Sequence, residues 1–364
     1  MIKLLIVDDS ALMRRLLGDV FKATGDFEVT FARDGVEALD RLATFQPDVV
    51  TLDVQMPRMD GLACLDRIMV MHPCPVVMVS SLTERGAEVT LDALQLGAVD
   101  FVAKPGGAIS LVMDEWGPVV VETVRAASKA RLRRSSRLAE RVRLRANGGA
   151  AAKPVRRHAR ARSAFVNPAM SAGPGDGVVL VGSSTGGPPA LDALLAPLPA
   201  DFPWPILIAQ HMPASFTGPL ARRLDTLCAL TVLEVTRPTP LVPGHVYIGR
   251  GDADMIVSAR ADGIVVTAAP ASSNYRWHPS VDRLVLTAME HLGPRRLIGI
   301  LMTGMGNDGA AAMTRLSAEG GRTIAEAEET AVVWGMPGEL VKAGGAQVIA
   351  PLDKIADHLR AWAP

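Results

Sequence analysis

Short apolar runs alternate with amphipathic segments throughout the first 120 residues of the chain. The runs have strand length and carry β-branched and aliphatic residues, whereas the segments between them have the apolar spacing of helices. The predicted strands are Leu4–Val7, Val29–Phe31, Val49–Leu52, Val76–Val79 and Phe101–Val102, and the predicted helices are Ala11–Lys22, Val36–Phe45, Leu62–Met71 and Ala87–Leu96. This alternation predicts an α/β domain over residues 1–120, built on a doubly wound parallel sheet.

The same pattern returns after residue 176. Three apolar runs, Val178–Val181, Ile206–Gln210 and Leu297–Met302, each lead into a turn rich in glycine or polar residues. Helical stretches follow, for example from Ala190. We expect residues 176–364 to form a second doubly wound parallel-sheet domain. A chain of 364 residues, of which 49% are hydrophobic, is long enough for two such cores.

The segment between these domains differs from both in charge. From Arg125 to Arg162 there are fourteen Lys or Arg residues and one acid, Glu140, although the whole chain has 38 basic and 38 acidic residues. We therefore interpret this run as the end of a helix that leads into a flexible linker, and we predict an Arg-rich linker over residues 121–175. A nucleic-acid-binding arm is the alternative, but no aromatic residue precedes Phe165 in this run and no recognition motif is present, so we expect no DNA binding. Whether the linker docks on acidic partners or only separates the domains stays open.

The N-terminal residues and the cysteines indicate the cellular compartment in which we expect the protein. The apolar run Met1–Val7 leads directly into Asp8 and Asp9, so it is too short, and too acidic at its end, for a signal peptide. No apolar stretch reaches bilayer-spanning length, and we expect no membrane insertion. Three cysteines, not spaced as metal ligands, fit a reduced, cytoplasmic setting.

Charged side chains follow several strands of the first predicted sheet. Asp8 and Asp9 end its first strand, Asp53 its third, Ser80 its fourth and Lys104 its fifth. Because these strand ends meet at one edge, the three carboxylates repel one another unless a cation lies among them, and oxygen ligands suit Mg²⁺. Asp53 is then a candidate to accept a phosphoryl group, with Lys104 and the Ser80 hydroxyl near its other oxygens. A helix cap is the alternative for any single aspartate.

With these residues, positions 1 to about 120 resemble a response-regulator receiver domain. Asp53 matches the phosphoacceptor of that family, Asp8 and Asp9 match its metal-binding pair, and Lys104 and Ser80 match its lysine and its hydroxyl switch residue. The resemblance implies that a histidine kinase supplies the phosphoryl group. It also implies that Mg²⁺, held by the three aspartates, is the cofactor of this step.

The turn Gly182–Gly187 follows the first apolar run of the second domain and has the G-x-S-x-G spacing around Ser184. The spacing favours an exposed hydroxyl, although an ordinary structural turn also fits it. A nucleophilic serine needs a base and an acid that orients the base. His211 follows the second apolar run and Asp308 lies in the turn after the third, so all three reach one sheet edge. We predict a catalytic triad of Ser184, His211 and Asp308, with a capping or core role as the alternative for His211.

The turn after the third apolar run also allows a different function. Gly304, Gly306 and Gly309 have the G-x-G-x-x-G spacing between a strand and a helix, and Glu326 ends the next predicted strand. Dinucleotide-binding domains share this arrangement. That alternative leaves the serine and the histidine without a role, so a hydrolase is favoured.

From about residue 176 onward the chain resembles the catalytic domain of chemotaxis protein-glutamate methylesterases, the CheB family. The motifs that carry the resemblance are Gly182–Gly187, Gln210–Pro213, Pro279–Asp282, Thr303–Gly309 and Gly335–Pro337. The resemblance implies that Ser184 attacks γ-glutamyl methyl esters of methyl-accepting chemoreceptors, with the amides of Thr185 and Met305 binding the oxyanion. It also implies deamidation of receptor glutamines, and no cofactor for ester hydrolysis.

Taken together, the two resemblances imply an enzyme of chemotactic adaptation under phosphorylation control. In such a protein the unphosphorylated receiver packs over the catalytic site, and phosphorylation of Asp53 relieves the block. The alternative is a phosphorylation-dependent binding module whose esterase is silent, which a methanol-release assay distinguishes.

Overall fold

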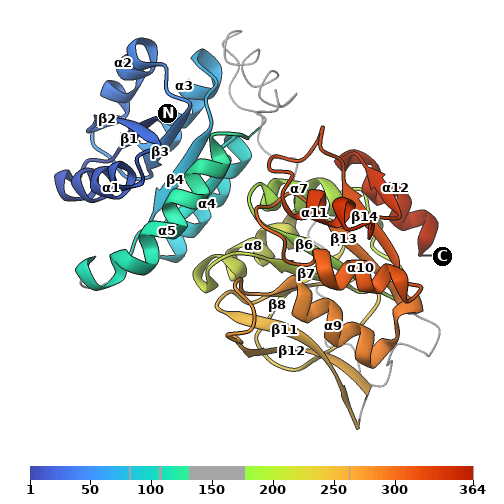
Figure 1. Cartoon of the computed structure of the whole chain (residues 1–364). Coiled ribbons are helices and arrows are strands. Elements are labelled where there is room, and N and C mark those ends of the chain that lie inside the picture. Colours follow the sequence, from blue (N-terminus) through green and yellow to red (C-terminus); the bar gives the residue numbers. More distant parts are fainter. Residues whose placement is uncertain (82, 106–108, 131–176, 262, 364) are drawn as a thin grey trace.

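In a computed structural model the chain forms two α/β domains (Figure 1). The structure describes residues 1–81, 83–105, 109–130, 177–261 and 263–363. From residue 131 onward, the predicted Arg-rich linker lies outside these residues. Helix α5 (Ile109–Ala127) continues past residue 120, where the first domain was predicted to end. This helix agrees with the helix end that the sequence predicts at the start of the Arg-rich segment.

The first domain is a five-stranded parallel sheet in the order β2-β1-β3-β4-β5, with helices on both faces. Its other elements are β1 (Ile2–Val7), α1 (Ala11–Thr24), β2 (Phe27–Ala32), α2 (Gly35–Phe45), β3 (Val49–Asp53), α3 (Gly61–Met71), β4 (Val76–Ser80), α4 (Glu84–Leu96) and β5 (Asp100–Ala103). Because successive strand residues face opposite ways, Leu4 and Ile6 pack with α1 and α5, whereas Leu5 and Val7 pack with α2, α3 and α4. The predicted strands and helices of this domain are confirmed.

Short polar side chains fix where several of these helices begin. Ser10 Oγ accepts a hydrogen bond from Met13 N, and Asp60 Oδ1 accepts one from Ala63 N. Such caps satisfy amides that have no partner within the helix. The helix after β1 therefore begins directly beyond Asp8 and Asp9, and the helix after β3 begins at Gly61, beyond the loop that follows Asp53.

The second domain contains a seven-stranded parallel sheet in the order β15-β14-β13-β6-β7-β10-β8. Its strands are β6 (Val178–Ser183), β7 (Ile206–Gln210), β8 (Thr231–Val235), β10 (His245–Gly249), β13 (Leu297–Leu301), β14 (Arg322–Glu326) and β15 (Val348–Ala350). Its helices are α7 (Gly187–Leu195), α8 (Ala214–Leu227), α9 (Val281–Leu292), α10 (Ala310–Ala318), α11 (Met336–Lys342) and α12 (Leu352–Trp362). Val179 and Val181 face α7, α8 and α12, while Val178 and Leu180 face α9, α10 and α11.

A small antiparallel sheet in the second domain departs from the expected all-parallel architecture. It consists of β11 (Ala253–Arg260), β12 (Gly263–Pro270) and β9 (Thr239–Pro240). Val257 and Val266 are buried and join the core beneath α9. The sequence pattern missed this sheet because its strands alternate apolar with small and polar residues and lack the continuous apolar runs of the main sheet.

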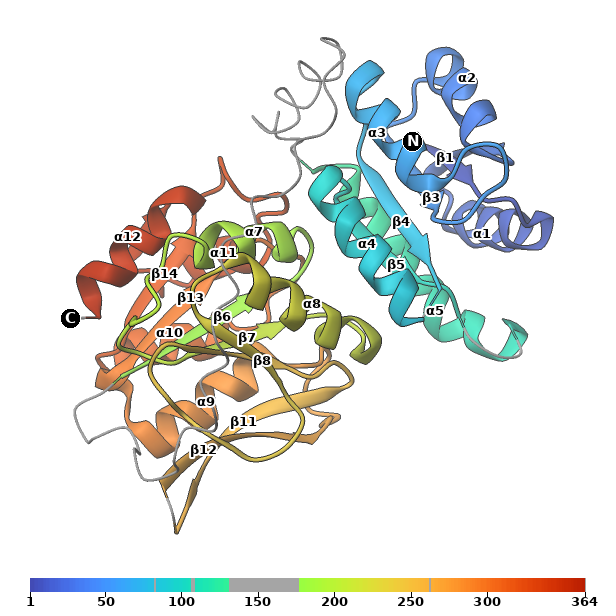
Figure 2. The ribbon, with the colours of Figure 1, turned by 180° about the vertical axis from the view of Figure 1, so that it is seen from behind.

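The two domains contact each other through the edge of the first sheet. Helix α4 packs against α8 and α7 (Figure 2), and the rings of Phe101 and Phe216 stack with centroids 4.2 Å apart. Arg223 Nη1 donates to the Leu91 carbonyl at 3.2 Å. This part of the boundary, around α4 and α8, thus combines an aromatic contact with a polar one.

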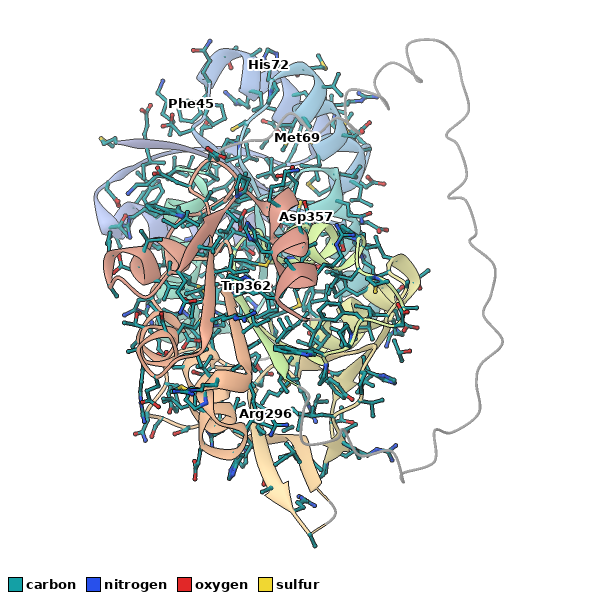
Figure 3. The ribbon with its side chains drawn as sticks, turned by 90° about the vertical axis from the view of Figure 1, so that its right-hand side faces the viewer. Phe45, Met69, His72, Arg296, Asp357 and Trp362 are labelled. Carbon is teal, nitrogen blue, oxygen red and sulfur yellow. The ribbon has the colours of Figure 1, made fainter. Side chains whose placement is uncertain are left out.

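The outer helices complete both domains. In Figure 3, Met69 and His72 mark α3 of the first domain, and Asp357 and Trp362 mark α12 of the second. Arg322 Nη1 donates to the Trp362 carbonyl at 3.1 Å, which ties the end of α12 to β14. None of the described helices is long and apolar enough to cross a membrane.

Candidate active site and phosphoacceptor site

The predicted catalytic residues follow three adjacent strands of the seven-stranded sheet. Ser184 follows β6, His211 follows the neighbouring β7, and Asp308 lies in the loop after β13, on the other side of β6. Backbone hydrogen bonds hold these strand ends together, from Ser184 N to Thr303 O and from His211 N to Ser183 O, both at 3.0 Å. Open α/β sheets bind ligands at this kind of edge.

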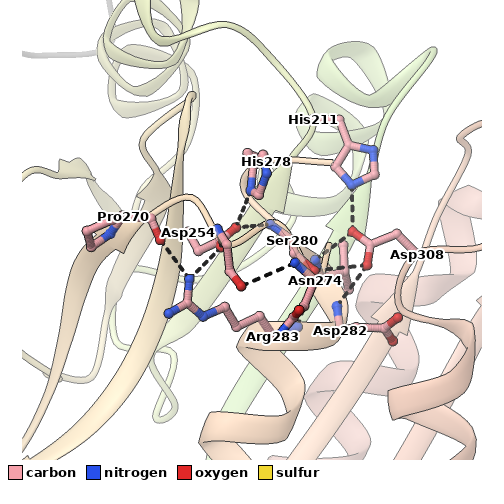
Figure 4. A network of polar contacts seen from close by, with 11 residues as sticks. His211, Asp254, Pro270, Asn274, His278, Ser280, Asp282, Arg283 and Asp308 are labelled. Atoms are coloured by element: carbon pink, nitrogen blue, oxygen red, sulfur yellow. Dashed lines mark hydrogen bonds and ion pairs between the residues drawn. The ribbon is translucent and has the colours of Figure 1, made fainter. Parts of the chain in front are cut away.

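His211 and Asp308 form a buried pair (Figure 4). His211 Nε2 lies 2.8 Å from Asp308 Oδ2, and both side chains are less than 10% exposed, at 7% and 4%. The Asp308 carboxylate also accepts hydrogen bonds from Val281 N at 2.7 Å and Asp282 N at 3.0 Å, at the start of α9. Burial by itself would raise the pKa of Asp308, but His211 and these amides bring it below its usual value. Asp308 is therefore held as a carboxylate.

The second imidazole nitrogen of His211 and the Ser184 hydroxyl are both without a hydrogen-bond partner among the described residues. His211 Nδ1 is buried and has no hydrogen-bond partner among the described residues. The Ser184 hydroxyl likewise makes no hydrogen bond within the described chain, whereas the neighbouring Ser183 Oγ donates to Gln210 Oε1 at 2.7 Å. Of the two adjacent hydroxyls, only that of Ser184 is uncommitted.

Two backbone amides beside Ser184 are suited to binding an anion. Within the described ranges, the N–H groups of Thr185 and Met305 have no protein acceptor. A side chain at Gly304 would lie 2.8 Å from Ser184 Cβ, so only glycine lets the Met305 loop approach this closely. The predicted oxyanion residues therefore lie on two chain segments that meet at the serine.

The loop that contains Gly304, Gly306 and Gly309 is not arranged as a dinucleotide-binding site. Its acidic partner, Glu326, is fully buried and accepts hydrogen bonds from Thr303 N at 2.8 Å and Thr330 Oγ1 at 3.0 Å. A ribose-binding carboxylate must face the ligand, whereas this one supports the loop from behind. The structure therefore contradicts the dinucleotide-binding interpretation.

Sequence reasoning missed a second polar group beside the triad. Asp254, on β11, is fully buried, lies 2.8 Å from His278 Nδ1 and accepts hydrogen bonds from Arg283 Nη1 at 2.6 Å and Ser280 N at 2.9 Å. Ser280 Oγ in turn donates to Asp308 Oδ1 at 3.1 Å (Figure 4). The only sequence signal was the position of His278 directly before Pro279–Asp282, because β11 was not predicted.

The acidic residues of the first domain also meet at a sheet edge. Asp8, Asp9 and Asp53 each place a carboxylate oxygen within 4.8 Å of the others. Lys104 Nζ lies 2.9 Å from Asp53 Oδ2 and 3.0 Å from Asp8 Oδ2, and this buried Asp8 oxygen makes no geometrically aligned hydrogen bond. Burial raises the pKa of Asp53 against the opposing effect of Lys104. Three clustered carboxylates that share one ammonium group keep a net negative charge, and their oxygens are a donor set that fits Mg²⁺.

Ser80 lies at the end of β4 and is buried. Its hydroxyl donates to the Gly86 carbonyl of α4 at 3.3 Å and makes no hydrogen bond to Asp53. The structure thus brings Asp8, Asp9, Asp53 and Lys104 together, whereas the Ser80 hydroxyl faces the start of α4.

The first domain reaches the active site of the second. Thr185 Oγ1 donates a hydrogen bond to Asp100 Oδ2 on β5, and burial raises the pKa of Asp100 to about 6 against the opposing effect of this bond. Arg276 Nη2 lies 2.6 Å from Glu122 Oε2 on α5. A cavity of about 440 Å³ between α5 and residues 331–335 has Met305 in its wall. Both proposed oxyanion residues therefore lie at or beside the domain boundary.

Comparisons with known proteins identify the families of the two domains. Residues 4–113 match the family described as response regulator receiver domain, and residues 179–359 match the family described as CheB methylesterase. The chain is 58% identical to protein-glutamate methylesterase/protein-glutamine glutaminase 2 of Rhodopseudomonas palustris (strain BisB18), covering 100% of this chain and 98% of that relative. It is 54% identical to protein-glutamate methylesterase/protein-glutamine glutaminase 3 of Rhodospirillum rubrum, covering 100% and 96%. The crystal structure of the Thermotoga maritima CheB methylesterase catalytic domain is 38% identical, with a TM-score of 0.49, and covers 50% of this chain and 97% of that one.

Proposed function

Because this chain belongs to the CheB family of protein-glutamate methylesterases, we propose that Ser184 is its nucleophile and that His211 and Asp308 activate this serine. The enzyme is a protein-glutamate methylesterase and glutaminase under receiver control, so its substrates are γ-glutamyl methyl esters and glutamine side chains. The observation that carries the residue assignment is the buried His211 ring, which Asp308 holds at Nε2 while Nδ1 has no partner in the described chain.

Acyl transfer follows from this geometry. Asp308 accepts a hydrogen bond from the Nε2–H of His211, which leaves Nδ1 unprotonated and able to take the proton of Ser184. Ser184 Oγ then bonds to the ester carbonyl carbon, and the resulting alkoxide collapses with loss of methanol, which receives its proton from Nδ1. Water attacks the acyl-enzyme by the same route and releases a glutamate carboxylate. With a glutamine substrate, the leaving group is ammonia.

The charge that develops on the carbonyl oxygen needs nearby donors. The free amides of Thr185 and Met305 lie on the two segments that meet at Ser184. Loss of one such donor typically raises a barrier by about 3 kcal/mol. These amides are the proposed oxyanion hole.

The first domain supplies control through Asp53. Asp8, Asp9 and Asp53 would hold Mg²⁺, which when bound neutralises charge on the transferred phosphoryl group. Lys104 already contacts two of these carboxylates and meets a phosphoryl oxygen after transfer from a histidine kinase. In this proposal Ser80 must turn from Gly86 toward the phosphoryl group, which couples modification to the start of α4.

Regulation acts through β5 and the elements beside it. Lys104 directly follows β5, the strand whose Asp100 contacts Thr185 and whose Phe101 stacks on Phe216. A change at Lys104 can therefore reach the domain boundary along one strand. We propose that phosphorylation loosens this boundary and opens the site to methyl-accepting chemoreceptors.

Methanol release from methylated receptor, with and without a small acyl phosphate as phosphodonor, tests this function. Ser184→Ala should lose at least about 10³-fold in rate, because no other free hydroxyl lies in the turn, while Asp53 still becomes phosphorylated. Ser183→Ala is the matched control, because the Ser183 hydroxyl is bonded to Gln210, and its rate should stay within about tenfold of the parent. Near-normal release by Ser184→Ala would contradict the assignment.

A further inference from the structure

Charged and aromatic groups from both domains stack in a column on the catalytic histidine. The Trp277 ring lies parallel to the His211 imidazole, with an interplanar angle of 1° and ring centroids 5.7 Å apart. Arg276 Cζ lies 5.0 Å from the Trp277 ring centroid, and Arg276 Nη2 lies 2.6 Å from Glu122 Oε2. A carboxylate of the first domain thus ends a column that begins at the reacting imidazole.

The inner part of this column is fixed by the second domain itself. His278, the next residue, lies 2.8 Å from the buried Asp254. On the other side, a side chain at Gly306 would lie 2.8 Å from the Trp277 ring, so the indole covers this glycine closely. Trp277 therefore keeps its place against His211 whether or not the first domain is docked.

Arg276 depends on the first domain for its acidic partner. Among the described residues, its ion pair is with Glu122 on α5, 154 positions away in the sequence, and the Arg276 side chain is 65% exposed even in this contact. When the first domain moves away, the guanidinium stays on the indole but has no acid from its own domain. A planar guanidinium held on an aromatic face selects a carboxylate by charge and by hydrogen-bond geometry.

Glu122 of α5 and Met305, a proposed oxyanion residue, line the same cavity, so a substrate that reaches Met305 from this side meets the surface beside α5. We propose that Arg276 is a specificity-determining residue, which binds a carboxylate of the substrate chain near the reacting glutamyl ester, and that Glu122 takes that carboxylate's place while the site is covered. The preferred substrate is thus an acidic segment. This inference rests on the proposed function, since it assigns a substrate preference to the same site.

Three synthetic peptides with one γ-glutamyl methyl ester each, flanked by glutamate, asparagine or lysine, provide the test. Methanol release is measured with the full-length protein in the presence of an acyl phosphate. Arg276→Gln should raise KM for the glutamate-flanked peptide by about threefold to tenfold, with kcat within about twofold, as expected for one exposed ion pair. KM for the asparagine-flanked peptide should change by less than about twofold. Arg260→Gln, which changes another exposed arginine of the same domain, is the matched control.

The charge-reversed pair separates substrate recognition from domain docking. Arg276→Glu combined with Glu122→Arg rebuilds the interdomain ion pair with opposite polarity. Under the proposal, this double variant keeps a low rate without phosphodonor but now prefers the lysine-flanked peptide. If Arg276 only holds the first domain, the double variant keeps the parent's preference among the three peptides, which overturns the inference.

These measurements distinguish a failure of this inference from a failure of the proposed function. Suppose that methanol release disappears in Ser184→Ala but that the parent has equal KM values for the three peptides. This result refutes the role of Arg276 and leaves the esterase assignment intact. Release that persists in Ser184→Ala refutes the esterase assignment itself. Unchanged KM in Arg276→Gln also refutes the inference, and this exposed substitution removes no buried contact that could prevent folding.

Discussion

Asp53 ends β3 in the first domain, and Asp308 follows β13 in the second, each at the carboxyl edge of a doubly wound parallel sheet. Both carboxylates are buried, at 4% exposure each. Burial and the neighbouring Asp8 raise the pKa of Asp53 despite Lys104, whereas His211 and two amides of α9 lower the pKa of Asp308 despite its burial. The carboxyl edges of two similar sheets thus hold two buried carboxylates whose pKa values are shifted in opposite directions.

The difference between them lies in what each carboxylate meets. Asp308 receives hydrogen bonds from a helix N-terminus and a ring, so its charge is satisfied and it can orient His211 without changing protonation. Asp53 faces two other acids and a single cation, Lys104, so the carboxylate cluster keeps a net negative charge that an added cation would stabilise. One site is complete with protein groups, and the other is built to gain a cation and a phosphoryl group. Asp100, at the boundary, gives a third environment, and the same Asp→Asn change probes all three.

Asp308→Asn should have the largest effect. The amide keeps the shape of the side chain but can no longer hold His211 with Nδ1 as the free base, so kcat for methanol release should fall by about 10⁴-fold. Asp252→Asn, an exposed change in the same domain, serves as the control. A loss smaller than tenfold would show that Asp308 is a structural acid only.

Asp53→Asn should remove regulation without removing the triad. An amide cannot accept the phosphoryl group, so the ratio of methanol-release rates with and without acyl phosphate should fall to about one. Asp40→Asn, on the exposed face of α2, should keep the stimulation of the parent. Stimulation that survives in Asp53→Asn would place the phosphoacceptor elsewhere.

Asp100→Asn should have the smallest effect of the three, and the effect should appear in the pH dependence of folding stability. The pKa of Asp100 is raised from 3.8 to about 6 in the folded chain, so the folded state binds the proton more tightly than the unfolded state. This contribution to stability is present below pH 3.8 and is lost as the pH rises to about 6.

Urea midpoints of parent and variant, compared across this pH range, measure that loss. The parent should lose stability relative to Asp100→Asn as the pH rises, and the difference should become constant above about pH 6. Asp19→Asn, an exposed aspartate of α1, should show no such trend. A constant difference between parent and Asp100→Asn at every pH would contradict the raised pKa.

The strands that precede the candidate functional residues were predictable, because continuous apolar runs identify buried parallel strands. The runs before Asp8, Asp53, Ser184 and His211 became β1, β3, β6 and β7, and the acids and the triad residues do lie at the expected edges. The antiparallel sheet was missed because its strands are mixed in composition, and of α5 only the end, at the start of the Arg-rich segment, was predicted. Asp254 and His278 were missed with that sheet.

The sequence alone determined the two domains, the CheB resemblance and the residues at each strand end, because parallel strands bring their carboxyl ends to one edge wherever they lie in the chain. Only the tertiary structure decided which histidine nitrogen Asp308 holds, which of two adjacent serines is free, and that Asp100 and Glu122 reach across to Thr185 and Arg276. These contacts join side chains from separate domains or loops. No periodic pattern encodes them, since they depend on how finished domains pack together.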